Sequence, residues 1–172
     1  MATAVNTPFV PLEEYLNTSY EPDCDYLDGV LEDRNAGQSK HSAAQTELIF
    51  WLRARADVHK HRVRTEQRVR ISPSRVRVPD VCLVDPTDNN EVIQTAPPLW
   101  IEVLSPDDRW NRLHKKLEDV ERLGKVTIWI VDPYSNEAWV ADGGPLTAAQ
   151  DGVLRCAALG LECPLREILP ED

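Results

Sequence analysis

The stretch 126–131, Val-Thr-Ile-Trp-Ile-Val, constrains the fold more than any other part of this sequence. It is apolar on both faces, which is typical of a strand inside a sheet that is covered on both sides. Residues 41–56 and 107–124 have apolar side chains at helical spacing, so they can supply that cover. Together these three segments predict an α/β protein.

Further strands are predicted around this centre. Asp28-Gly29 predicts a turn between two short strands within residues 25–33. Residues 62–71 alternate between charged and other side chains, which predicts one half-exposed strand. Shorter apolar runs predict strands at residues 76–78, 81–84, 99–104, 137–141 and 153–156. The order helix, three strands, helix, strand over residues 43–132 predicts an α/β core with extra strands at both ends, within a single domain 1–172.

Two acidic residues stand where their neighbours make a carboxylate costly. Asp80 opens the strand 81–84, and Glu102 interrupts the apolar strand 99–104. An ionised carboxylate away from water needs a cation or several hydrogen-bond donors. If the two strands are neighbours, both carboxylates converge on one divalent cation, with the backbone carbonyl of Val103 as a third ligand. Mg²⁺ prefers hard oxygen ligands, so we predict a magnesium site in which Mn²⁺ is a substitute.

A lysine beside this site would complete a hydrolytic centre. Lys115 and Lys116 lie on the predicted helix that follows Glu102, and Lys116 is the better candidate. Its ammonium group can orient or deprotonate a water and stabilise charge that develops on a phosphate. Structural explanations stay open for each residue. Asp80 can cap a strand end or make a turn, Glu102 can pair with an arginine, and Lys116 can face solvent.

Charge is distributed unevenly along the chain. The net charge is −10, yet residues 53–77 contain nine Lys or Arg and only two acidic residues. Such a stretch is either a phosphate-binding face or a surface hairpin whose charges pair with acids elsewhere. On the first interpretation the candidate DNA contacts are Arg64, Arg68 and Arg70, with His41 as a further candidate.

Several motifs, in this order and spacing, resemble the Uma-type putative restriction endonuclease family of the PD-(D/E)XK nuclease superfamily. They are Tyr26-Leu-Asp28-Gly29, His41, Pro79-Asp80, Trp100-Ile-Glu102-Val-Leu-Ser105-Pro106, Lys116 with Gly124, Trp129-Ile-Val-Asp132-Pro133 and Leu159-Gly160-Leu161. The resemblance covers nearly the whole chain. It implies a restriction endonuclease-like αβββαβ core with a mixed sheet, and a magnesium-dependent phosphodiesterase site.

The resemblance also implies roles for particular residues. Asp80 matches the motif aspartate, Glu102 the metal-binding glutamate, and Asp25 an acidic position that is a further candidate ligand. The lysine of the superfamily normally stands two residues after the glutamate, where this chain has Leu104; the lysine that matches the family is Lys116 instead. Other family positions differ: a helix tyrosine is Val120 here, and a glutamate-tyrosine pair is Thr127-Ile128.

The predicted function is a metal-dependent endonuclease that hydrolyses DNA phosphodiester bonds, with Asp80, Glu102 and Lys116 as catalytic residues. A homodimer is expected, because restriction-type enzymes usually reach both strands of a duplex as dimers. Two alternatives stay open: a catalytically weak or inactive binding or regulatory module with the nuclease fold, and a structural, oligomer-forming protein. The four cysteines lack a C-x-x-C pair, and the sequence lacks a signal segment or membrane-length apolar run, which predicts a cytoplasmic protein without membrane association.

Overall fold

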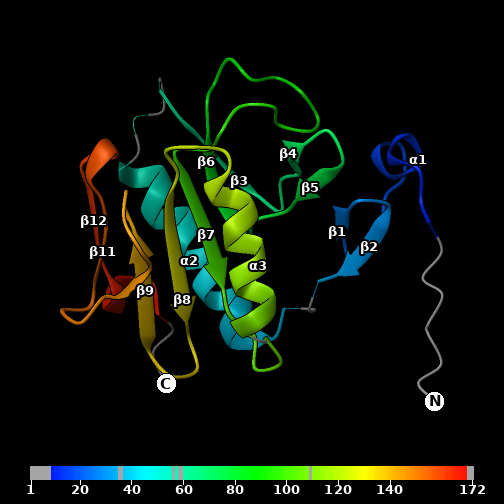
Figure 1. The fold of residues 1–172 in the computed structure, drawn as a ribbon. Coiled ribbons are helices and arrows are strands. Elements are labelled where there is room, and N and C mark those ends of the chain that lie inside the picture. The colour runs from blue at the N-terminus through cyan, green and yellow to red at the C-terminus, as the bar shows by residue number, and fades with distance from the viewer. Residues whose placement is uncertain (1–8, 35–36, 56, 58–59, 109, 170–172) are drawn as a thin grey trace.

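Within the residues that the computed structural model describes, 9–34, 37–55, 57, 60–108 and 110–169, six strands form the main sheet (Figure 1). Their order is β10-β9-β8-β7-β6-β3, with bounds β3 Arg62–Thr65, β6 Val81–Val84, β7 Leu99–Val103, β8 Thr127–Asp132, β9 Glu137–Ala141 and β10 Thr147–Ala148. β7 and β8 are parallel and the other neighbours are antiparallel, so the sheet is mixed. The predicted strand 126–131 is β8, which lies between β7 and β9 as its two apolar faces indicate.

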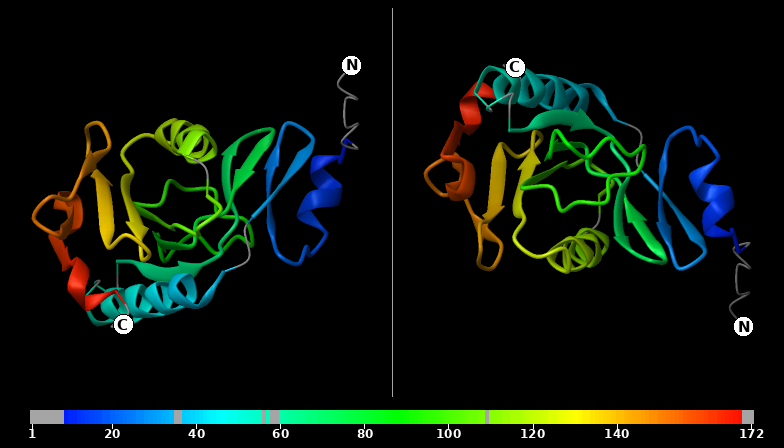
Figure 2. Two further views of the ribbon diagram at one scale, coloured as in Figure 1. Left: turned by 90° about the horizontal axis from the view of Figure 1, so that it is seen from below. Right: turned by 90° about the horizontal axis from the view of Figure 1, so that it is seen from above.

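Helices α2 (Ser39–Arg55) and α3 (Trp110–Glu121) cover opposite faces of the main sheet (Figure 2). Successive residues of β7 show this arrangement, because side chains of a strand alternate between its faces. Ile101 belongs to the same apolar cluster as Leu48 of α2, whereas Trp100 packs in the cluster that contains Leu117 of α3. α3 also supplies the long crossover that the parallel pair β7 and β8 requires. In the described part of the chain, no helix has the length and apolar character to cross a membrane.

A second sheet lies beside the main one and is built from the N-terminal hairpin and the middle of the chain. Its order is β2-β1-β5-β4, with bounds β1 Cys24–Leu27, β2 Val30–Asp33, β4 Val69–Ser72 and β5 Arg75–Arg77. α1 (Leu12–Leu16) packs against it through Tyr15, whose ring centroid lies 5.0 Å from that of Tyr26. Figure 1 shows α1 and the hairpin at the side of the molecule away from the C-terminal strands.

The C-terminal residues extend the core on the α2 face. β11 (Val153–Cys156) pairs with β12 (Leu161–Pro164), and the 3₁₀ turns η1 (Ala157–Leu159) and η2 (Leu165–Glu167) follow β11 and β12. Leu154 and Cys163 join the apolar cluster that contains α2. The strand predicted at residues 153–156 is β11, which forms a separate two-stranded sheet with β12; no strand was predicted at residues 161–164.

The prediction of one strand over residues 62–71 is wrong. β3 pairs with β6 in the main sheet, whereas β4 pairs with β5 in the second sheet. Between them Glu66 has φ 48°, a left-handed conformation that interrupts an extended chain. The alternation of charged and other side chains continues through this break, so the pattern alone does not reveal it.

Candidate metal-binding site

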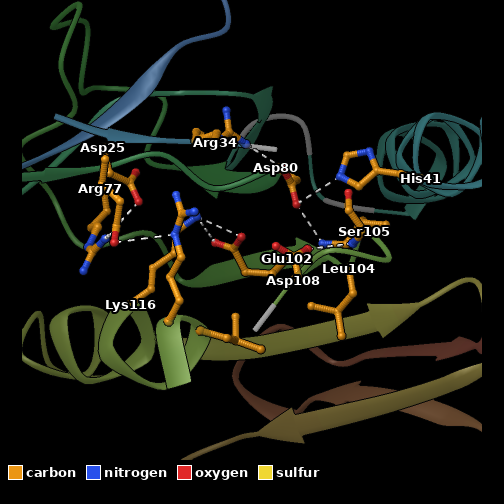
Figure 3. A pocket seen from close by; sticks show the side chains of 14 residues that line it. Asp25, Arg34, His41, Arg77, Asp80, Glu102, Leu104, Ser105, Asp108 and Lys116 are labelled. Atoms are coloured by element: carbon orange, nitrogen blue, oxygen red, sulfur yellow. Dashed lines mark hydrogen bonds and ion pairs between the residues drawn. The ribbon is translucent and has the colours of Figure 1, made fainter. Parts of the chain in front are cut away.

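Asp80 and Glu102 lie opposite each other on two neighbouring strands, as the sequence predicted (Figure 3). Asp80 directly precedes β6, and Glu102 lies within β7. Val81 pairs with Ile101 in antiparallel register, which sets the preceding Asp80 across from Glu102. Both residues are buried, with 6 % and 7 % of their surface exposed. The sheet thus brings two carboxylates to one place with little water to solvate them.

The Asp80 carboxylate is held in its ionised form by surrounding donors. Arg34 donates from Nη2 to Oδ1 at 2.5 Å, the Val103 backbone N–H donates to Oδ2 at 2.8 Å, and His41 Nε2 lies 3.5 Å from Oδ2. Burial alone would raise the pKa of Asp80. The hydrogen bond from His41 and the positive charges of Arg34 and Lys116 outweigh burial, so they hold the pKa of Asp80 below its usual value.

The Glu102 carboxylate is bound by Lys116 and by an indole. Lys116 Nζ lies 2.7 Å from Oε1 and 2.8 Å from Oε2, and Trp100 Nε1 donates to Oε1 at 2.6 Å. Lys116 also donates to the Val78 backbone carbonyl at 2.7 Å, which fixes the ammonium group between β7 and the segment that joins β5 to β6. Burial raises the pKa of Glu102 to about 7 in spite of the Lys116 charge, and the Asp80 charge adds to this rise. The Glu102 carboxyl group therefore keeps its proton to a higher pH than a free glutamate does.

The backbone of Val103 adds an oxygen to this donor set. Its N–H points to Asp80 on the β6 side of β7. Because the N–H and C=O of one residue in an extended strand point to the same side, the Val103 carbonyl is also directed toward the β6 side. The sequence prediction named this carbonyl as the third ligand, and its direction agrees with that role.

The residues present fit a hard divalent cation. Asp80, Glu102, Val103 and Lys116 line a hollow of about 60 Å³, more than the roughly 10–15 Å³ that one water-sized probe needs. Two carboxylates and a carbonyl suit Mg²⁺, which usually keeps several waters. Over the described ranges, no group of three or more His, Cys, Asp or Glu could hold a metal ion.

Asp25 lines the same hollow, but its carboxylate is used elsewhere. Oδ2 accepts from Arg77 Nη1 at 3.0 Å, and Oδ1 accepts from the Val78 backbone N–H at 2.8 Å. Both oxygens are thus engaged, and the side chain is buried. Asp25 supports the loop that carries Asp80, and we leave it out of the ligand set proposed below.

Arg68, a predicted DNA contact, is bound within the protein. Its guanidinium group donates to Asp23 at 2.7 and 3.0 Å and to the carbonyls of Tyr15 and Thr18 at 3.1 and 3.0 Å. It also lies 4.3 Å from the centroid of the Tyr15 ring. These contacts attach α1 to the start of β4, so we do not include Arg68 among the proposed DNA contacts.

The other predicted DNA contacts come from three different elements. Arg64 on β3 donates to the Val63 carbonyl at 3.2 Å, and Arg70 on β4 donates to the Pro73 carbonyl at 3.1 Å. The two strands belong to different sheets, so the turn at Glu66 separates these side chains. His41 is buried beside Asp80 on α2 and belongs to the carboxylate site.

Much of the basic stretch 53–77 forms ion pairs with acids elsewhere in the chain. Besides Arg68, the pairs are Arg55 with Glu167 at 3.0 Å, Arg75 with Asp28 at 2.6 Å and with Asp119 at 2.7 Å, and Arg77 with Asp119 at 2.8 Å. Of the two interpretations that the sequence left open, the structure favours internal pairing for these arginines.

Two residues of the site were not predicted from the sequence. Arg34 lies in the segment between β2 and α2, which has no periodic pattern of side chains. The apolar sequence of β7 indicates that Trp100 is a core residue and nothing more. The sequence did contain one signal for a residue such as Arg34. Two buried carboxylates need more than one positive charge to balance them, and Lys116 supplies only one.

The protein has the restriction endonuclease-like fold: a mixed sheet with a helix on each face, and acidic residues at the start of β6 and within β7. The model of the Uma2 family, described as "Putative restriction endonuclease", matches residues 12–162. The chain therefore belongs to this family, and both the predicted family and the predicted fold class are confirmed. Lys116 beside Glu102 also agrees with the lysine position that the sequence assigned to α3.

A solved structure has the same fold. It is a crystal structure of a putative nuclease belonging to DUF820 from Anabaena variabilis, with a TM-score of 0.80 and 21 % sequence identity. The similarity covers 92 % of this chain and 97 % of that chain. No curated protein matches this sequence.

Proposed function

We propose that this protein is a metal-dependent endonuclease that hydrolyses DNA phosphodiester bonds, as one domain spanning residues 1–172. The observation that carries the proposal is the meeting of three side chains at one hollow: Asp80 opposite Glu102, with Lys116 Nζ 2.7 Å from the glutamate. Membership of a family described as restriction endonucleases supports the nuclease class. The superfamily generally uses divalent metal ions, so the chemistry and the donor set agree.

The proposed cation ligands are Asp80, Glu102 and the backbone carbonyl of Val103. Mg²⁺ is the expected ion because all three groups are hard oxygen donors, and Mn²⁺ is expected to substitute. When bound, the ion supplies Lewis-acid activation of the phosphate and of a water nucleophile. Asp80 is ready to bind at neutral pH because its pKa is lowered, whereas Glu102 must release a proton first.

Lys116 is proposed to position the attacking water and to stabilise charge on the phosphate. Its ammonium group is fixed by Glu102 and by the Val78 carbonyl, so it needs little reorganisation during the reaction. It also replaces the lysine of the superfamily motif, since Leu104 at that position is apolar and nearly buried. The adjacent Lys115 is exposed and has no part in the proposal.

The proposed partner is duplex DNA, reached by a homodimer so that both strands can be cut. Arg64, Arg70 and His41 remain candidate contacts with the nucleic acid. A cytoplasmic location is part of the same proposal, because Cys24, Cys82, Cys156 and Cys163 are buried and free, which suits a reducing compartment. Light scattering of the purified protein tests the dimer.

Nicking of a supercoiled plasmid in the presence of Mg²⁺ or Mn²⁺ tests the enzymatic proposal. The wild type should convert supercoiled DNA to open-circular and linear forms, and EDTA should stop the conversion. Lys116→Met should retain cation binding by calorimetry and lose nicking by about 10²-fold or more, the range typical of a lost proton-transfer or charge-stabilising group. Lys115→Met is the matched control and should nick as the wild type does.

The same assay separates the enzyme from the binding or regulatory module. Cation binding that is lost in Asp80→Ala and Glu102→Ala, together with plasmid that stays intact over a broad range of pH and cation, would support the module. Absence of cation binding in the wild type would instead remove the metal site from the proposal.

A further inference from the structure

Arg34 binds the oxygen of the Asp80 carboxylate that a cation would need. Its Nη2 lies 2.5 Å from Asp80 Oδ1, while the second oxygen of Asp80 is engaged by the Val103 N–H. The Arg34 side chain is only 12 % exposed. Burial lowers the pKa of its guanidinium group, but the negative charges of Asp80, Glu102 and Asp25 outweigh burial and raise this pKa. Neither the superfamily motif nor the proposed roles above account for an arginine at this place.

Arg34 also borders two hollows. One is the hollow of about 60 Å³ that contains Glu102 and Lys116. The other, of about 200 Å³, also borders Asp80 and is lined by residues that include Gln45 and Glu66. Arg34, His41 and Asp80 line both. The Arg34–Asp80 ion pair therefore borders both hollows, and Figure 3 shows it near Glu102.

A cation and Arg34 compete for Asp80. Both are positive, and two positive groups within a few Å repel each other strongly at a buried site. A divalent ion that binds Asp80 and Glu102 therefore weakens the hold of Asp80 on the guanidinium group. The larger hollow beside Arg34 gives the side chain room to move without unfolding the strands that carry the carboxylates.

We propose that Arg34 is an exchange residue, that is, a residue that changes its binding partner when a cation binds. In the cation-free protein it neutralises Asp80. When a divalent cation binds, Arg34 releases Asp80 Oδ1 and then contacts a phosphate oxygen of the DNA backbone. This rests on the proposed function, because it assumes the cation site at Asp80 and Glu102. A guanidinium group suits the second step, since its planar donors match the geometry of a phosphate oxygen pair as they match a carboxylate. Substrate and cation would then bind with positive cooperativity through one side chain.

The test compares two affinities in the full-length protein. Arg34→Met should bind Mn²⁺ more tightly than the wild type in calorimetric titrations, by about fivefold or more, because one nearby positive charge and one competitor for Asp80 are removed. The same variant should bind a short DNA duplex, measured by fluorescence anisotropy with Ca²⁺, about tenfold more weakly, because a charge-assisted phosphate contact is lost. Effects of opposite sign distinguish exchange from a structural role, which would weaken both.

Two further variants control the experiment. Arg34→Lys keeps the charge and should restore the wild-type Mn²⁺ affinity while recovering only part of the DNA affinity. Arg155→Met removes an ion-paired arginine from β11, where it contacts Asp151 at 2.8 Å, and should change neither affinity. Thermal unfolding of each variant shows that the fold is kept.

The outcomes separate this inference from the proposed function. If the wild type binds no Mn²⁺, the cation site itself fails. If the wild type binds Mn²⁺ but Arg34→Met binds it equally or more weakly, the exchange is overturned and the cation site stands. If the Mn²⁺ affinity of Arg34→Met rises but its DNA affinity is unchanged, Arg34 does not contact phosphate and the second step is overturned.

Discussion

Asp80 and Glu102 lie in one hollow but hold their protons differently. Burial raises the pKa of both carboxyl groups. The hydrogen bond from His41 and the positive charge of Arg34 lower the pKa of Asp80, which stays below its usual value. Glu102 has Lys116 as its main positive neighbour and also faces the charge of Asp80, and its pKa rises to about 7. Of the two carboxylates, Glu102 is thus the one that takes up a proton at the higher pH.

We expect Mn²⁺ affinity to depend on pH through Glu102. Below pH 7 a cation must displace a proton from this carboxyl group, so the affinity should fall about tenfold for each pH unit; above pH 7 it should level off. Calorimetric titrations between about pH 5.5 and about pH 8.5 measure this dependence. An affinity that stays constant over the whole interval would contradict the assignment of Glu102 as a ligand.

Trp100 is expected to adjust that titration through its hydrogen bond to Glu102. Trp100→Phe removes the donor at 2.6 Å from Oε1, which favours the protonated carboxyl group and should move the pH midpoint of Mn²⁺ affinity upward. Unfolding by urea should show a loss of about 1–3 kcal/mol, because a buried hydrogen bond to a carboxylate is lost. Trp129→Phe is the matched control, because it removes an indole bond to the Arg155 carbonyl at 2.8 Å. The Trp129→Phe variant should be less stable to urea, and the pH midpoint of its Mn²⁺ affinity should not change.

The two carboxylates could be predicted from the sequence, whereas their partners could not. Glu102 stands in an apolar strand, and a buried acid in such a strand requires a function or a counter-charge. Trp100 has the same apolar neighbours, so nothing in the pattern distinguishes its hydrogen bond from simple packing. Arg34 belongs to a connecting segment, where contacts depend on the path of the chain rather than on periodicity.

At the scale of elements, Arg77 connects the second sheet with α3. It is buried at the end of β5 and donates to Asp119 of α3 at 2.8 and 3.0 Å, to Asp25 at 3.0 Å and to Glu32 at 2.7 Å. Asp119 follows Lys116 by three residues on the same helix, so it lies about one turn away. The ion pair therefore sets the position of α3 from which Lys116 reaches Glu102.

We expect Asp119→Ala to destabilise the protein by about 3 kcal/mol, because it leaves the buried Arg77 without one of its carboxylates. Urea unfolding followed by circular dichroism measures the loss. Asp151→Ala, which breaks an exposed ion pair with Arg155, should leave the unfolding midpoint unchanged. Equal unfolding midpoints for the two variants would show that the Arg77 network does not hold α3.

The break between β3 and β4 shows why element boundaries are harder to predict than elements. β6 and β7 have apolar runs bounded by Asp-Pro and Ser-Pro, and their ends agree with those punctuation residues. Glu66 is neither glycine nor proline, and its left-handed φ of 48° depends on how the two sheets meet, where its N–H donates to the Asp80 carbonyl at 3.2 Å. Tertiary contacts therefore decide this boundary.

At the scale of the whole molecule, the acidic net charge and the internal ion pairs limit how the protein can hold DNA. The chain carries −10, and the arginines of the basic stretch that pair with acids are not available as phosphate contacts. Composition could predict that this stretch is basic but not where its charges point. Arg64 and Arg70, which bind backbone carbonyls, remain the candidates from that stretch.

We therefore expect DNA affinity to depend only weakly on salt. Each phosphate contact contributes a slope of about −0.9 to log K against log salt, so two or three contacts give a slope of about −2 to −3. Fluorescence anisotropy of a short duplex with Ca²⁺, from about 50 to about 300 mM KCl, measures this slope. Arg64→Met should reduce its magnitude by about 1, whereas Arg68→Met should leave the slope unchanged and lower the thermal stability, because Arg68 binds Asp23 and two carbonyls inside the protein. A wild-type slope steeper than about −6 would show a broad basic face, which the ion pairs of these arginines do not allow.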